Sequence, residues 1–223
     1  MPDRTCVAGM NAQRKSFRRE GEDFRRRELV EATLTCIATL GMERTTVREI
    51  AIKAGVTAGL IRHYFSSKEE LVLAAYSHYV GQMAAQSRQT VKGVSANPLI
   101  QLAAFVKTNL SAPVVDQTNL SLWASFIETI RTNPAMAAIH LEGYHGYRSD
   151  AEALISAAFA SCCRAVSPEH VRRMGISLNA IIDGLWLEGS MSQGEFADGE
   201  LARIGIEAAS ALLGIDLQKA DMK

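Results

Sequence analysis

The sequence of 223 residues lacks features that would assign it to several common classes of protein. No run of eighteen apolar residues occurs, so we expect no membrane-spanning helix. The opening segment has no continuous apolar stretch, so we expect no signal peptide. Only five prolines are present, and no segment alternates apolar and polar residues between hairpin turns, which argues against β-structure. The apolar share of 48% is ample for a core and excludes global disorder.

Signatures of metal or enzymatic chemistry are also missing. The four cysteines are Cys6, Cys36, Cys162 and Cys163. They lack the spacing of a zinc site, and we interpret them as reduced thiols of a cytoplasmic protein. His140 and His145 are five residues apart, which is the wrong spacing for two ligands on one helical face. Because no nucleophile elbow, P-loop or dinucleotide fingerprint occurs either, we expect no metal site, no cofactor and no enzyme.

The net charge of zero conceals an uneven distribution along the chain. Residues 1–65 contain 12 Lys or Arg and 8 Asp or Glu, whereas residues 66–223 contain 12 and 16. Basic residues are densest over 14–27, where seven Lys or Arg accompany three acids. This bias indicates either an N-terminal part that contacts a polyanion or a solvated tail.

The periodicity of the chain predicts an all-α fold. Apolar and small residues from Leu29 to Leu40 follow one face of a helix, and Gly41 can end it. Thr45 or Thr46 can then cap a short helix that ends at Gly55. A third helix is expected from Thr57 to Tyr64. A fourth should run from Ser66 or Ser67 to about residue 88, with a capping box completed by Glu69 or Glu70. Further helices are expected over 97–111, 113–118, 119–132, 135–164, 168–190 and 198–213.

Two short helices joined by a tight turn at Gly55 form a helix-turn-helix unit. Val56, Ile61 and Phe65 can pack the second helix on the first, which leaves its other side chains for DNA. Arg62 suits a bidentate contact with guanine. Small residues at the start of the second helix, Ala58 and Gly59, permit close approach to base edges. The residues predicted to contact DNA are Thr46, Arg48, Thr57, Ala58, Gly59, Arg62, His63, Tyr64 and Lys68. Of these, His63, Tyr64 and Lys68 suit phosphate, although Tyr64 can equally be a core aromatic.

At these residues the chain resembles a known family. The stretch 29–71, with its segments TTVREIA, AGVTAG, HYF and SKEEL, is similar to the DNA-binding domain of TetR-family transcriptional repressors. The resemblance implies a homodimer with three N-terminal helices that bind a palindromic operator, and a larger helical domain whose ligand weakens DNA binding. We expect a flexible basic arm at 1–23, the DNA-binding domain at 24–70 and the ligand-binding and dimerisation domain at 71–223. Many relatives carry an aromatic where this chain has Arg62, so no operator can be inferred.

The C-terminal part resembles a subgroup of that family, the BetI-like repressors of the betaine pathway. The similarity lies in LWASFIETIRTNPAMAAIHLEGYHGYRSD (122–150) and LNAIIDGLWLEG (178–189). It implies a sensor for a quaternary ammonium such as choline or an aldehyde derivative.

Aromatic and acidic residues in the same domain suit such a ligand. Trp123 and Phe126 share a helical face, which indicates either core or a cation cage, and Asp183 lies in an otherwise apolar segment near Trp186. A buried Asp needs a partner, which can be a ligand cation or an Arg. The candidate ligand-binding residues are Trp123, Phe126, Tyr144, Asp183 and Trp186.

The sequence allows two interpretations of the long C-terminal helices and two of the function. Small residues on helices 135–164 and 168–190 fit either an intersubunit four-helix bundle or ordinary packing within one chain. The alternative function is a DNA-binding regulator without a small-molecule response, controlled by a protein partner or acting architecturally. A cavity within 97–190 would favour the sensor over this alternative.

Overall fold

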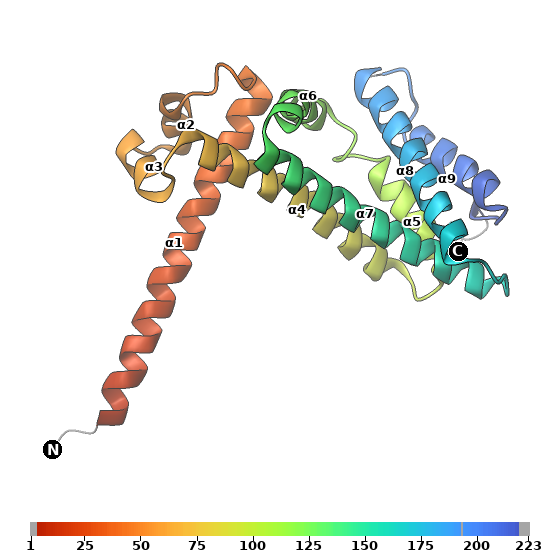
Figure 1. Cartoon of the computed structure of the whole chain (residues 1–223), viewed down its shortest axis with the longest axis horizontal. Helices are drawn as coiled ribbons and strands as arrows, with labels where there is room; N and C mark the ends of the chain where they lie inside the picture. Colours follow the sequence, from red (N-terminus) through yellow and green to blue (C-terminus); the bar gives the residue numbers. More distant parts are fainter. Residues whose placement is uncertain (1–3, 193, 219–223) are drawn as a thin grey trace. The chain divides into compact units, whose positions relative to one another are not determined.

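The computed structural model describes the backbone of residues 4–192 and 194–218, and the side chains of 21–192 and 194–218. All regular structure in these residues is helical, which confirms the predicted fold class (Figure 1). The helices are α1 (Arg4–Leu40), α2 (Val47–Ala54), α3 (Ala58–Tyr64), α4 (Lys68–Val94), α5 (Pro98–Asn109), α6 (Gln117–Thr132), α7 (Pro134–Ser161), α8 (Pro168–Met191) and α9 (Glu200–Leu213). Over the described part of the chain, no helix is long and apolar enough to cross a membrane.

The chain divides into two compact units, residues 1–76 and 77–223. The division falls within α4, six residues beyond the expected boundary at 70. Unit 1 therefore contains α1 to α3 and the first turns of α4. Unit 2 contains the rest of α4 and all later helices.

Local sequence signals account for α2 and α3. Thr46 and Thr57 cap them, because each hydroxyl oxygen accepts the N–H group three residues later, at 3.2 and 3.3 Å. Gly55 ends α2 with φ at +66°, a conformation that side chains disfavour. The chain can then reverse, and buried Ile61 and Phe65 fix α3 in the core of unit 1.

Several boundaries differ from the sequence-based ones. Helix α1 is continuous from Arg4, so it includes most of the segment that was expected to be a flexible arm. Arg, Glu, Gln and Ala in this stretch favour helix. Helix α4 extends to Val94 rather than 88. The helix expected at 113–118 is wrong: Pro113 lies in a turn, and Asp116 caps α6 by accepting the N–H of Asn119 at 2.6 Å. The other three helix-starting prolines do occupy the first helical position.

The core of unit 2 is built mainly from α5, α7, α8 and α9. Its buried apolar side chains include Leu102, Phe105, Val106, Ile155, Phe159, Leu178, Ile206 and Leu213. Helix α9 lies close to α5 because Gly205 has no side chain: a Cβ there would lie 2.2 Å from Leu110 Cδ1. This core fixes α7 and α8, the helices that supply most of the pocket described below.

Small residues on α7 and α8 bring these two helices together within one chain. Gly175 is buried, and a Cβ at this position would lie 2.7 Å from Glu152 Cγ. Ala151 is buried as well. These two residues therefore belong to packing within the chain, whereas Ala160 and Ala180 are exposed.

Candidate functional site

The helix-turn-helix of unit 1 presents most of its predicted DNA-contacting side chains to solvent. Thr46, Arg48, Thr57, Gly59, Arg62 and His63 are exposed, and Ala58, Tyr64 and Lys68 are half-buried. A recognition helix contacts base edges with residues near its N-terminus. In α3 the exposed residues at the start of the helix, and Arg62 one turn later, are available for such contacts. The rings of His63 and Tyr64 meet edge to face, with centroids 5.1 Å apart.

One residue of the basic segment has a structural contact that sequence reasoning did not assign. Arg26 on α1 donates a hydrogen bond to the carbonyl oxygen of Tyr64 at 3.0 Å, at the carboxyl end of α3. Its guanidinium carbon also lies 4.1 Å from the centroid of the Phe65 ring, and Glu70 is 3.7 Å away. A positive charge near a helix C-terminus is stabilising, because it interacts favourably with the helix dipole. Arg26 therefore holds α3 against α1 and is not merely an exposed side chain available to DNA phosphate.

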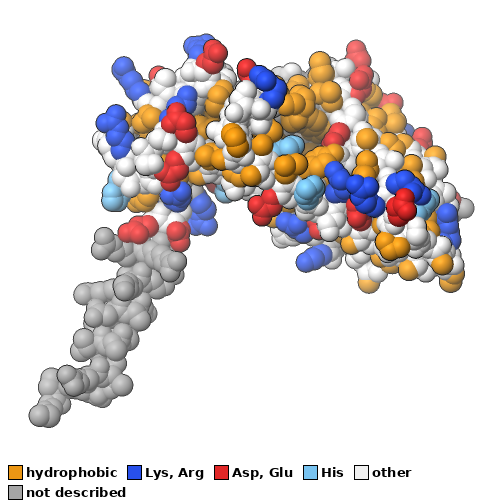
Figure 2. All heavy atoms as spheres, viewed as in Figure 1, with side chains coloured by type: hydrophobic (Ala, Val, Ile, Leu, Met, Phe, Trp, Pro, Cys, Tyr) orange, Lys and Arg blue, Asp and Glu red, His pale blue; other side chains and the backbone are white. Residues whose placement is uncertain are grey.

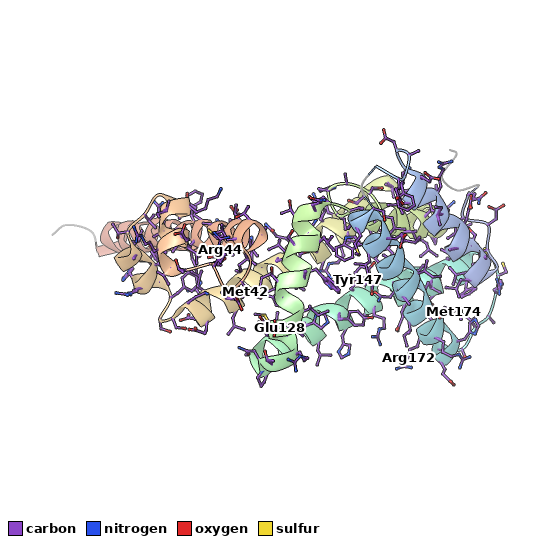
Figure 3. The ribbon with its side chains drawn as sticks, turned by 90° about the horizontal axis from the view of Figure 1, so that it is seen from above. Met42, Arg44, Glu128, Tyr147, Arg172 and Met174 are labelled. Carbon is purple, nitrogen blue, oxygen red and sulfur yellow. The ribbon has the colours of Figure 1, made fainter. Side chains whose placement is uncertain are left out.

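Lys68 is likewise engaged within unit 1. Its Nζ donates to the carbonyl oxygen of Met42 at 3.3 Å, across the turn that follows α1 (Met42 is labelled in Figure 3). Next to it, Ser67 accepts the N–H of Glu70 at 3.1 Å while the Glu70 carboxylate accepts from the N–H of Ser66 at 2.8 Å. This reciprocal capping fixes the start of α4, the element expected to face phosphate.

Unit 2 contains a cavity of about 430 Å³ that is lined by residues of α4, α5, α6, α7 and α8 and of the loop before α6. Figure 2 shows hydrophobic side chains around a hollow between α6 and α8. The lining residues are Tyr79, Met83, Asn109, Val114, Trp123, His140, Tyr144, Tyr147, Asn179, Ile182, Asp183, Gly184, Trp186 and Leu187. They include five aromatic rings besides His140, one carboxylate and neither Lys nor Arg.

Four of the five predicted ligand-binding residues line this cavity: Trp123, Tyr144, Asp183 and Trp186. Phe126 does not, and its assignment as a cage wall is wrong. Its side chain is only 1% exposed, and its ring stacks on Tyr79 with centroids 6.4 Å apart. On α6 the buried face runs through Leu122 and Phe126, which places Trp123 at its edge and open to the cavity. Phe126 thus supports a wall that Tyr79 supplies.

The two tryptophans form one corner of the cavity. Their rings meet edge to face, with centroids 6.0 Å apart. Trp186 Nε1 donates to the carbonyl oxygen of Val114 at 2.9 Å, which fixes the indole orientation from the loop before α6. Aromatic faces held in this way attract a cation whose water shell has been removed.

Asp183 has an amide partner rather than the Arg that the sequence left open. Asn179, one turn earlier on α8, donates from Nδ2 to Asp183 Oδ2 and to Tyr144 Oη, both at 2.7 Å. Asp183 is exposed to solvent, yet partial burial of its carboxylate raises the pKa of Asp183, an effect that Asn179 and the nearby His140 oppose. Burial correspondingly lowers the pKa of His140, which Asp183 opposes. A cation in the cavity would favour the ionised carboxylate.

Tyr144 contributes its hydroxyl rather than a free ring face. His140 lies one turn before it and stacks on the ring, with centroids 5.8 Å apart. Arg148 lies one turn after it, with the guanidinium carbon 4.9 Å from the ring centroid. Since these neighbours lie one turn before and one turn after Tyr144 on α7, they cover its ring.

Sequence reasoning missed several lining residues, of which Tyr79 and Tyr147 are the most informative. Tyr79 lies on α4, outside the 97–190 range in which a cavity was sought, and only tertiary packing brings it to the other walls. Tyr147 follows Tyr144 by three residues on α7. That spacing places both on one helical face and was the available signal.

Comparisons with known proteins agree with both units. Residues 29–75 match the model of bacterial regulatory proteins of the tetR family, and residues 98–214 match that of the BetI-type transcriptional repressor C-terminal domain. The chain belongs to the TetR family, with a C-terminal domain of the BetI type. It is therefore a transcriptional repressor of a non-enzymatic family that binds DNA through its helix-turn-helix.

Individual relatives of this TetR-family chain support the assignment. The regulator BetI of Stenotrophomonas maltophilia is 30% identical over 175 residues, which cover 78% of this chain and 86% of that protein. BetI of Escherichia coli is 28% identical over 172 residues, covering 77% and 85%. A crystal structure of a transcriptional regulator from Pseudomonas aeruginosa PAO1 has a TM-score of 0.74 and 28% identity, covering 86% and 89%.

A fourth relative was crystallised with a small molecule. The transcriptional regulator from Saccharomonospora viridis in complex with choline has a TM-score of 0.70, covering 83% of this TetR-family chain and 95% of that one. At 18% identity it shows a shared fold alone.

Proposed function

We propose that this chain is a homodimeric repressor whose hold on a palindromic operator is released by a small organic cation bound in the cavity of unit 2. The observation that carries the proposal is the composition of that cavity, where the lining residues include one carboxylate and five aromatic side chains besides His140, and neither Lys nor Arg. Aromatic faces replace water around the methyl groups of a quaternary ammonium, and the carboxylate compensates its charge.

Two further points support a sensor over a regulator without a ligand. A cavity of about 430 Å³ is large enough for a small ligand, within the usual range of roughly 300–1,000 Å³ for such sites. The structural relative from Saccharomonospora viridis holds choline in its crystal. A repressor controlled only by a protein partner has no need of such a cavity.

The dimer is proposed from the requirements of DNA recognition. One helix-turn-helix reads only a few base pairs, so useful specificity requires two half-sites related by a two-fold axis. A ligand that favours a dimer with a different separation of its two recognition helices would then weaken operator binding.

A thermal-shift experiment with matched ligands tests the cation site. We expect choline to raise the melting temperature, because a ligand at one hundred times its Kd adds about 2.7 kcal/mol to the stability of the native state. The neutral isostere 3,3-dimethylbutan-1-ol, in which carbon replaces the quaternary nitrogen, should have a much smaller effect. Equal shifts with both compounds would contradict recognition of charge.

A further inference from the structure

Tyr147 is one of the residues that line the cavity of unit 2, and its hydroxyl has an unusual environment. Its Oη is buried, and no hydrogen-bond partner for it lies among the residues that the structure describes. The Tyr147 ring packs on Phe105, with centroids 5.0 Å apart, so its position is fixed by the core (Tyr147 is labelled in Figure 3). An unpaired buried hydroxyl lowers stability, and such groups in native proteins call for an explanation.

The surroundings of Tyr147 keep this hydroxyl protonated. Burial and the nearby groups Asp183 and Tyr144 all raise the pKa of Tyr147. It is therefore a hydrogen-bond donor at any physiological pH. Two neighbouring polar groups already have a partner, since the Asn179 amide donates to both Tyr144 Oη and Asp183 Oδ2.

We infer that Tyr147 determines ligand specificity by donating a hydrogen bond to an oxygen atom of the bound cation. The inference rests on the proposed function, because it assigns the second polar contact of the same ligand. Asp183 and the tryptophans recognise the charged end, which every quaternary ammonium possesses. Tyr147 strengthens the binding only of a cation that also carries a hydroxyl or carbonyl oxygen, since any other ligand leaves the buried donor unpaired.

The test compares two cations that differ in one group. Choline carries a hydroxyl where propyltrimethylammonium carries a methyl, and the shape and charge are otherwise the same. Calorimetry on the full-length wild-type chain should show roughly tenfold or greater preference for choline. Tyr147→Phe should abolish this preference by weakening choline about tenfold while changing propyltrimethylammonium by no more than about twofold.

Melting of the ligand-free variants separates a ligand contact from a packing role. Removing an unpaired hydroxyl should leave the melting temperature of Tyr147→Phe unchanged or raise it, so choline affinity should fall without a loss of stability. The matched control is Tyr76→Phe, which removes a buried tyrosine hydroxyl outside the cavity. This control should keep the wild-type preference for choline.

Each other outcome overturns the inference in a recognisable way. If Tyr147→Phe still prefers choline, or if it melts earlier and weakens both cations equally, Tyr147 acts only in packing. If wild-type protein binds both cations equally, the cation sensor stands and the role of Tyr147 is wrong. If neither cation binds, the proposed function fails and the inference fails with it.

Discussion

At the scale of single residues, Asp183 is the side chain on which recognition of a positive charge depends. It is the lone carboxylate among the residues that line the cavity, and Asn179 holds it in place at 2.7 Å. Replacing Asp183 by Asn keeps the shape and removes the charge. We expect calorimetry to show choline affinity lower by about 1–2 kcal/mol, less than for a fully buried pair because the carboxylate remains open to solvent. Asp150→Asn is the control, since Asp150 pairs with Arg88 away from the cavity.

The same residue should make choline binding depend on pH. A permanent cation binds the ionised carboxylate better, so binding lowers the raised pKa of Asp183 and releases a proton. Affinity should therefore fall as the pH is lowered toward that raised pKa, and protonation of His140 would act in the same direction. The fall should be smaller in Asp183→Asn. A pH profile that is identical in the wild type and in this variant would exclude Asp183 as the counter-charge.

Arg62 should read a base of the operator. It is exposed on α3, where a guanidinium can pair with both acceptors of a guanine in the major groove. Arg62→Ala should cost about 1–3 kcal/mol on the preferred operator and relax the preference at one position. Arg44→Ala is the control, because Arg44 is equally exposed but lies in the turn before α2 (labelled in Figure 3). Equal losses for Arg62→Ala on operator and random DNA would show that it contacts only phosphate.

Residue chemistry explains which parts of the candidate site could be predicted. Trp123, Asp183 and Trp186 have side chains that the proposed ligand requires, and they lie in the segments that resemble the BetI-like repressors. Whether Phe126 lines the cavity depends on the rotation of α6 about its axis, which places this side chain behind Tyr79. The periodicity of a single sequence does not determine that rotation. The covered faces of Tyr144 depend on His140 and on Arg148, whose rotamers the sequence does not specify.

At the scale of elements, the packing of α3 on α1 depends on Arg26. Loss of its hydrogen bond to Tyr64 and of its contact with the Phe65 ring should lower the free energy of unfolding of Arg26→Ala by about 1–2 kcal/mol. Arg25→Ala removes the same charge from the same helix but loses only an exposed pair with Glu28, which is worth about 0–1 kcal/mol. Chemical denaturation of both variants measures the difference.

Operator binding by these two variants tests the same contact. Each loses one positive charge, so any general electrostatic loss should be similar. Arg26→Ala should lose more, because α3 is less firmly held in position to enter the groove. If the two variants have equal stability and equal DNA affinity, Arg26 does not position α3.

Element boundaries were predictable where they depend on neighbouring residues. Thr46, Gly55 and Thr57 act through hydrogen bonds and dihedral angles within one turn, so α2 and α3 are as expected. The helix expected at 113–118 was wrong because proline, which is common at helix starts, is also common in turns. Asp116 instead caps α6, which begins at Gln117. The start of α1 at Arg4 was not expected from the sequence, because the charge of this segment drew attention to its contacts, although Arg, Glu, Gln and Ala also favour helix.

At the scale of the whole molecule, specific DNA binding should require two copies of the chain. Analytical ultracentrifugation at micromolar concentration should give a dimer, and operators selected from random duplexes should contain inverted half-sites whose centres are one helical turn or more apart. Binding should weaken steeply with salt, since several basic side chains would displace counterions from phosphate. A monomer that binds a single half-site with full affinity would contradict the dimer.

The coupling between the cation cavity and the helix-turn-helix is tested most directly by titrating choline into the protein with and without its selected operator duplex. Two linked binding equilibria must affect each other by the same factor, typically about 5–150-fold. We expect calorimetry to show that saturating operator lowers choline affinity by the factor by which saturating choline lowers operator affinity. Choline affinity that is the same with and without operator would contradict a ligand-released repressor.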